Sequence, residues 1–157
     1  MNGISPPVLR EMAAHARKAY PEECCGVLIE DASGALSFRP IANIAGSIGA
    51  AGISARTNRD GYVMDPRGLM AAQEEADRLV GRLWGIVHSH PDVGAYFSRE
   101  DRAKALDDAG QEPLWPGVRY LVISARASGI DRALLYTWDA ARHDFIEEEV
   151  REIAGLY

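Results

Sequence analysis

The sequence predicts an α/β protein in which helices cover a β-sheet. Segments whose apolar residues recur at helical spacing are interleaved with short apolar runs of strand length, and this mixture is typical of a helix-covered sheet. The chain has 157 residues, of which 47% are hydrophobic and 25% are charged. These values predict one domain, residues 1–157, that folds without disulfide bonds. They exclude collagen-like, disordered and disulfide-scaffold proteins.

The first elements are a helix and a hairpin. Ser5, followed by two prolines, is typical of a helix N-terminus, and apolar residues at helical spacing extend the helix over residues 6–20. Pro21 ends it. Two apolar runs, residues 24–29 and 35–41, are joined by a short turn and predict two antiparallel strands.

The middle of the chain is the least regular part. Residues 42–62 are rich in glycine and alanine, and we expect a loop there. Asp65 followed by Pro66 predicts a helix that continues to about Val80. The longest uncharged stretch, residues 40–55, is too short for a membrane-spanning helix, which needs about 20 apolar residues. We therefore expect no membrane association.

The second half of the chain is dominated by predicted strands. A turn-rich segment, residues 91–97, precedes a helix that begins at Ser98 and continues to about Ala109. The acidic run 147–149 is unfavourable for the last of the expected strands. The strands are expected at residues 83–89, 118–124, 132–138 and 144–150.

Charge and cysteine content restrict the partners and the compartment. The net charge is −6, so no basic excess is available to neutralise phosphates, and nucleic acid is not an expected partner. The N-terminus lacks the apolar core of a secretory signal. Cys24 and Cys25 are adjacent, form no CxxC pair, and are expected to be buried and reduced in the cytoplasm.

The most informative segment contains His88 and His90. Residues i and i+2 of a strand face the same side, so both imidazoles should project together from the end of an apolar strand. Zinc binds imidazole nitrogens and carboxylate oxygens, and an open zinc site needs a third protein ligand plus a water. The loop after His90 can deliver a carboxylate, and Asp92 is one candidate. Ser98 and Asp101, three residues apart, are by themselves most simply a helix-capping pair.

Together these elements resemble a known family. The string H-S-H-P, followed by S-x-x-D with seven residues between His90 and Ser98, looks like the JAMM motif of the MPN+ metalloproteases. Residues 21–26 also match the upstream family pattern P-x-E-x-x-G, with Glu23 at the position of the catalytic glutamate. The resemblance implies the MPN (JAMM) fold, a curved mixed β-sheet flanked by helices. The chain is most similar to small bacterial members that act on ubiquitin-like sulfur-carrier proteins.

The resemblance also implies a role for each residue. His88, His90 and Asp101 would bind one Zn²⁺, with the nucleophilic water in the fourth position. Glu23 would accept the proton of the water and later protonate the leaving amine, and Ser98 would donate to the oxyanion. The substrate would be a ubiquitin-like or sulfur-carrier protein, cut after its C-terminal Gly-Gly. The bond that is cut could join the Gly-Gly end to an added cysteine, to a C-terminal extension or to a conjugated lysine.

Several alternatives stay open from the sequence. An MPN protein can serve as a binding scaffold without catalysis. A RadC-like, DNA-associated protein shares a related motif but usually carries asparagine between the histidines, where this chain has Ser89. A zinc deaminase is set aside, because it would need H-x-E and a later P-C-x-x-C, which this sequence lacks. We expect Glu22 to be a solvated carboxylate and the segments 91–97 and 42–62 to wall a substrate groove. The pathway and the oligomeric state are not predicted.

Overall fold

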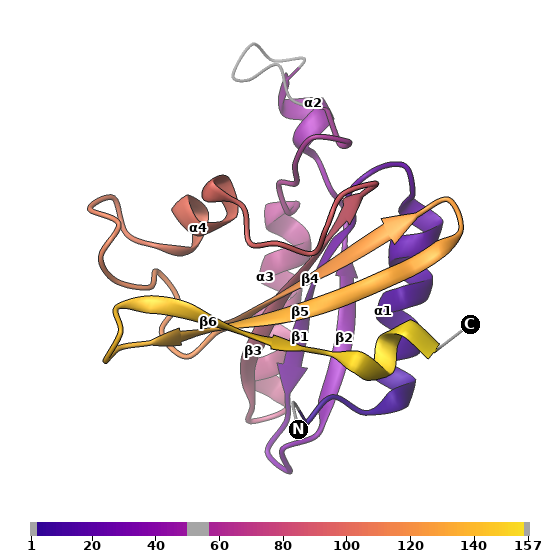
Figure 1. Ribbon diagram of the computed structural model, residues 1–157. Coiled ribbons are helices and arrows are strands. Elements are labelled where there is room, and N and C mark those ends of the chain that lie inside the picture. Colours follow the sequence, from indigo (N-terminus) through magenta and orange to yellow (C-terminus); the bar gives the residue numbers. More distant parts are fainter. Residues whose placement is uncertain (1–2, 50–56, 156–157) are drawn as a thin grey trace.

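A computed structural model describes residues 3–49 and 57–155 of the chain. These residues form a six-stranded sheet of order β2-β1-β3-β4-β5-β6 (Figure 1). Strands β3 and β4 are parallel and all other neighbouring pairs are antiparallel, so the sheet is mixed, as expected. The strands are β1 (Cys25–Glu30), β2 (Leu36–Ile41), β3 (Arg82–Pro91), β4 (Arg119–Arg126), β5 (Gly129–Asp139) and β6 (Asp144–Glu149).

Helices cover both faces of this sheet. Each of the two longest begins with proline in its first turn, where the missing N–H costs no hydrogen bond. Asp65 also caps its helix by accepting a hydrogen bond from the amide of Arg67. The helices are α1 (Pro6–Ala19), α2 (Ala45–Gly49), α3 (Pro66–Arg78), α4 (Arg99–Ala105) and the 3-10 helix η1 (Arg151–Gly155).

The sheet separates two hydrophobic cores. Leu28 and Leu121 face the core that also contains α1 and η1, whereas Val27 and Val122 face the core beneath α3 and α4. Successive strand residues point to opposite faces, so each central strand contributes to both cores. His88 follows Ile86 by two residues and therefore lies on the α3 and α4 side of the sheet.

Two expected boundaries differ from the structure by more than two residues, and one expected loop contains a helix. Helix α4 ends at Ala105, not near residue 109, because Leu106 is extended and forms a β-bridge with Pro113. Strand β5 starts at Gly129 rather than at residue 132, since β4 and β5 are joined by a tight turn. The stretch 42–62, expected as a loop, contains the short helix α2, and its residues 50–56 lie outside the described part of the chain.

The last strand forms in spite of its acidic run. Strand β6 is an edge strand, and Glu147, Glu148 and Glu149 are exposed to solvent, where their charges are well hydrated. Arg132 on β5 also pairs with Glu149 at 2.8 Å. Cys24 and Cys25 are free and buried, as expected. Among the described residues, the helices are too short or too polar to cross a membrane.

Candidate metal centre

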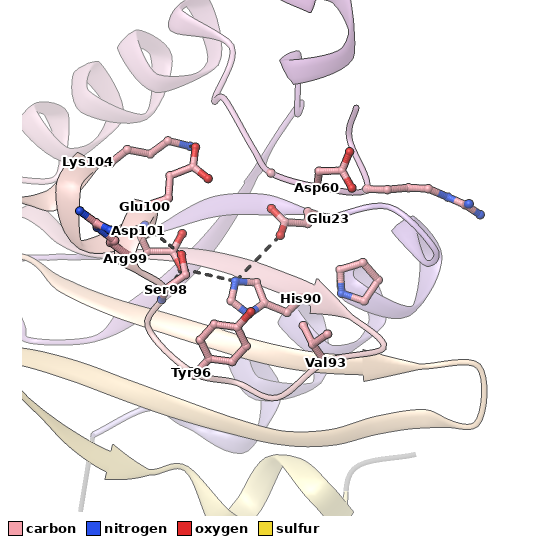
Figure 2. A pocket seen from close by; sticks show the side chains of 13 residues that line it. Glu23, Asp60, His90, Val93, Tyr96, Ser98, Arg99, Glu100, Asp101 and Lys104 are labelled. Atoms are coloured by element: carbon pink, nitrogen blue, oxygen red, sulfur yellow. Dashed lines mark hydrogen bonds and ion pairs between the residues drawn. The ribbon is translucent and has the colours of Figure 1, made fainter. Parts of the chain in front are cut away.

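Three potential metal ligands converge at the end of β3. His88 and His90 lie near its C-terminal end, and Asp101 lies in the first turn of α4. The Nε2 atoms of the two histidines are 3.2 Å apart. Oδ2 of Asp101 lies 3.2 Å from Nε2 of His88. The same oxygen lies 3.4 Å from Nε2 of His90 (Figure 2). All three residues are buried, so the cluster is shielded from solvent.

The size of this triangle fits a zinc ion. Zinc binds nitrogen and oxygen at about 2.0–2.2 Å in a tetrahedron, so two of its ligand atoms are separated by roughly 3.3–3.5 Å. The three measured separations, 3.2 Å, 3.2 Å and 3.4 Å, are close to that edge length. Two imidazoles and one carboxylate leave a fourth tetrahedral position for water or substrate. The donor set and its spacing therefore fit an open zinc site.

The loop after β3 fixes the ring of His90. Nδ1 of His90 lies 3.1 Å from the carbonyl oxygen of Gly94, which sets Nδ1 as the protonated nitrogen and leaves Nε2 with its lone pair. The loop is itself held in place, because the Ser124 hydroxyl donates to the carbonyl of Val93 at 2.5 Å. The Tyr136 hydroxyl donates to the carbonyl of Ala95 at 3.0 Å. The segment 91–97 is thus anchored to β4 and β5.

The electrostatics of the cluster favour a neutral His88 and an ionised Asp101, the forms that bind a metal. Burial lowers the pKa of His88, which favours the neutral imidazole that a metal requires. Burial also opposes charge on His90, but its hydrogen bonds to Asp101 and Gly94 and the nearby Glu23 carboxylate raise its pKa above the usual value. Burial alone would raise the pKa of Asp101, and hydrogen bonds from both histidines outweigh it and hold that pKa well below its usual range.

Ser98 and Asp101 form the capping arrangement expected for this spacing. Oγ of Ser98 accepts the amide hydrogen of Asp101 at 3.0 Å, and Oδ2 of Asp101 accepts the amide hydrogen of Ser98 at 3.0 Å. This reciprocal pair fixes the Asp101 carboxylate over the two histidines. The Ser98 hydroxyl keeps its own hydrogen as a donor.

Glu23 lies just before β1, the strand that pairs with β3, and its side chain reaches the same site from there. Its carboxylate is 8% exposed, and Oε1 lies 3.9 Å from Nε2 of His90 (Figure 2). Burial, supported by the negative charge of Asp101, raises the pKa of Glu23 to about 7, against the pull of His90. A carboxyl group with this pKa can both accept and donate a proton near neutral pH.

The backbone around Glu23 is held by residues that the sequence alone does not single out. The amide of Glu23 donates to the carbonyl of Asn58 at 2.6 Å, and Nδ2 of Asn43 donates to the carbonyl of Glu23 at 3.0 Å. Between the two histidines, Ser89 points to the opposite face, and its Oγ accepts the amide hydrogen of Cys24 at 2.9 Å. These contacts join residues far apart in sequence, so no local motif indicates them.

Other candidate residues lie away from the cluster. Asp92, the alternative ligand, accepts the Tyr20 hydroxyl hydrogen, with both carboxylate oxygens 2.9 Å from that hydroxyl, and it does not join the three grouped side chains. Glu22 is exposed, as expected for a solvated carboxylate. His15 lies against the carbonyl of Cys25 at 3.2 Å on the other side of the sheet, and His143 is exposed.

The cluster borders an open cavity of about 490 Å³, a volume within the usual range for binding sites. Glu23, His90, Ser98 and Asp101 all line it (Figure 2). Two expected wall segments contribute as well, with Tyr96 from the loop 91–97 and Asp60 from the segment 42–62. Its rim carries charges of both signs, from residues that include Arg59, Arg99, Glu100 and Lys104.

Fold and cluster together define an α/β protein with a buried His-His-Asp group at the end of the central strand of a mixed sheet. The chain belongs to the family of prokaryotic homologs of the JAB domain, whose family model matches residues 5–153. The expected MPN (JAMM) fold and the resemblance to the JAMM/MPN+ family are therefore confirmed.

Known proteins with a similar sequence or fold support this assignment. A curated desampylase from Haloferax volcanii is 29% identical over 117 residues, which is 71% of each chain. The solution structure of a protein from Desulfitobacterium hafniense matches with a TM-score of 0.63 and 27% identity, over 93% of this chain and 88% of the other. A solution structure from Salinibacter ruber matches with a TM-score of 0.58 and 24% identity, over 92% of this chain and 87% of the other, and shows the fold alone.

Proposed function

We propose that this protein is a zinc-dependent peptidase or isopeptidase that hydrolyses the bond after the C-terminal Gly-Gly of a ubiquitin-like protein. The observation that carries the proposal is the triangle of His88, His90 and Asp101, with donor atoms 3.2–3.4 Å apart beside a buried glutamate in an open cavity. The similarity to a desampylase supports the substrate class. A small cytoplasmic ubiquitin-like or sulfur-carrier protein is therefore the proposed partner.

Each residue then has one task in the reaction. His88, His90 and Asp101 would hold the metal, since their donor atoms lie close together and face one another. When bound, zinc supplies Lewis acidity, which makes water nucleophilic at neutral pH and polarises the scissile carbonyl. Oε1 of Glu23 accepts the proton of the attacking water and then passes it to the leaving amine. The Ser98 hydroxyl donates to the oxygen that becomes negative in the transition state.

The cavity explains how a tail can be selected by a small protein. A Gly-Gly tail has no side chains, so its backbone can approach the groups that line the cavity, Glu23 and His90 among them, without steric hindrance. The charges on the rim, such as Arg59 and Glu100, lie where the folded body of a partner would meet the chain. Recognition of the partner would then rest on the tail and on local charge pairs, because the net charge of −6 offers no broad basic face.

The test is cleavage of defined substrates by the purified protein. A ubiquitin-like carrier ending in Gly-Gly is joined to lysine, to a short C-terminal extension or to cysteine, and the products are identified by mass spectrometry. We expect hydrolysis after Gly-Gly of at least one substrate, loss of turnover with a chelator, and its return on addition of zinc. Stoichiometric binding of the carrier without turnover, in zinc-loaded protein, would instead establish the non-catalytic scaffold.

A further inference from the structure

The two histidines of the cluster are oriented in different ways. Nδ1 of His90 is hydrogen-bonded to the Gly94 carbonyl, but the buried Nδ1 of His88 has no hydrogen-bond partner among residues 3–49 and 57–155. Metal-bound histidines usually donate their second ring nitrogen to an acceptor, which fixes the plane of the ring. Within the described residues, the orientation of the His88 ring must therefore be fixed by a contact other than a hydrogen bond at Nδ1.

An aromatic ring lies against His88. The centroids of the Tyr62 and His88 rings are 4.5 Å apart with an interplanar angle of 24°, which is a stacked pair. Tyr62 is 7% exposed, so its ring is confined by the core beneath α3 and α4. His88 is fully buried, and the His90 ring lies at its Nε2 edge, with ring centroids 4.9 Å apart and an interplanar angle of 63°.

Lys104 of α4 holds Tyr62 in this position. Its Nζ lies 4.5 Å from the centroid of the Tyr62 ring and donates a 2.6 Å hydrogen bond to the Tyr62 carbonyl. The Lys104 ammonium also pairs with Glu100 at 3.8 Å, so its charge is balanced from its own helix. Figure 2 shows Lys104 and Glu100 side by side above the cavity. Lys104, Tyr62 and His88 thus form a stack that runs from α4 to the metal cluster.

We infer that Tyr62 is a positioning residue, whose ring fixes the plane of His88 so that Nε2 points at the metal, with Lys104 as its clamp. This inference rests on the proposed zinc site. Rotation about the last bond of the histidine side chain turns the Nε2 lone pair away from the metal, and the flat face of Tyr62 prevents that rotation. The stack takes the place of the missing hydrogen bond at Nδ1.

The test is the zinc affinity of Tyr62→Leu and Tyr62→Phe, measured by competition with a chromophoric chelator. Loss of an orienting group typically weakens metal binding by about 10- to 100-fold. We expect Tyr62→Leu to bind zinc about tenfold more weakly and Tyr62→Phe, which keeps the ring, to bind like the wild type. Tyr96→Leu is the matched control. The rings of Tyr96 and His90 have centroids 5.1 Å apart, but the hydrogen bond from Nδ1 to the Gly94 carbonyl already orients His90. This control should change the affinity less than about twofold.

Each outcome separates positioning from packing. Equal zinc affinity for Tyr62→Leu and the wild type, even with a less stable fold, overturns the inference and leaves the proposed function intact. A wild type that binds no zinc defeats the proposed function itself. If Tyr62→Leu does not fold, Lys104→Met keeps both rings and removes the clamp. We then expect a several-fold loss of zinc affinity, and an unchanged affinity overturns the inference.

Discussion

Ser98 illustrates how one side chain can stabilise a helix and serve a reaction. Its Oγ accepts the amide hydrogen of Asp101 and so caps α4, while its hydroxyl hydrogen is available to the cavity that Ser98 lines. The spacing of the two residues predicts the cap from local rules alone. The second role depends on where α4 is placed, and no local rule fixes that.

Replacing Ser98 with alanine should therefore have two measurable effects. Loss of the cap costs about 1 kcal/mol of unfolding free energy. Loss of an oxyanion donor lowers kcat by about 10²–10³-fold. Ser98→Thr retains a hydroxyl and should recover most of both. Denaturant unfolding and initial rates with a Gly-Gly conjugate measure the two effects, and a stability loss with an unchanged kcat would leave Ser98 as a cap only.

Glu23 should also make the stability of the metal-free protein depend on pH. Its pKa is raised from the ordinary glutamate value of 4.5 to about 7 on folding, so between these values the folded protein holds a proton that the unfolded chain has lost. Protonated Glu23 therefore stabilises the folded protein fully below pH 4.5, and this stabilisation decreases as the pH rises to about 7. The loss is at most about 3 kcal/mol. Glu23→Gln removes it.

The measurement is the difference in unfolding free energy between chelator-treated wild type and Glu23→Gln from about pH 4.5 to about pH 8. We expect the unfolding free energy of Glu23→Gln to rise relative to that of the wild type as the pH increases to about 7. Above that pH the difference should be constant. Parallel curves over the whole range would mean that the folded protein does not raise the pKa of Glu23.

At the scale of elements, the sequence predicts the end of β3 and the start of α4 far better than it predicts the residues that hold the backbone around the site. The apolar run before His88 and the Ser98 cap indicate the end of β3 and the start of α4, because both signals are local. Asn43 gives no such signal, since most of its partners lie about 20 residues away on either side. Its Nδ2 donates to the carbonyls of Glu23 and Gly61, and its Oδ1 accepts the amide hydrogens of Ala45 and Val63.

This use of all four hydrogen-bonding positions makes Asn43 sensitive to an isosteric change. In Asn43→Asp an acceptor replaces the amide group that donates to the carbonyls of Glu23 and Gly61, so Glu23 loses one of its two backbone hydrogen bonds. We expect an unfolding free energy lower by about 1–3 kcal/mol and a kcat that falls more than KM changes, with zinc binding intact. Gln73→Glu, the same kind of change at an exposed position of α3, is the matched control. If Asn43→Asp has the kcat of Gln73→Glu, Asn43 does not position Glu23.

At the scale of the whole molecule, the site exists only once the sheet has formed. Glu23 precedes β1, the histidines end β3, and Asp101 opens α4, so the four groups meet through pairing of β1 with β3 and packing of α4. The sequence indicates these residues through their resemblance to a family motif, and it leaves their distances undetermined. The distances depend on long-range contacts such as the hydrogen bond between Ser89 and Cys24. The same dependence explains why Tyr62 and Asn43 emerge only from the folded chain.

In the proposed reaction, a metal held by His88, His90 and Asp101 acts together with proton transfer by Glu23. Its most direct test is the hydrolysis of a Gly-Gly–lysine isopeptide by zinc-loaded wild type, Glu23→Gln and the neighbouring control Glu22→Gln, with the zinc content of each protein measured. We expect one zinc per chain in all three, wild-type turnover for Glu22→Gln, and a loss of at least about 10²-fold for Glu23→Gln. Unchanged turnover in Glu23→Gln at full zinc content, or turnover in protein free of zinc, would rule out this mechanism.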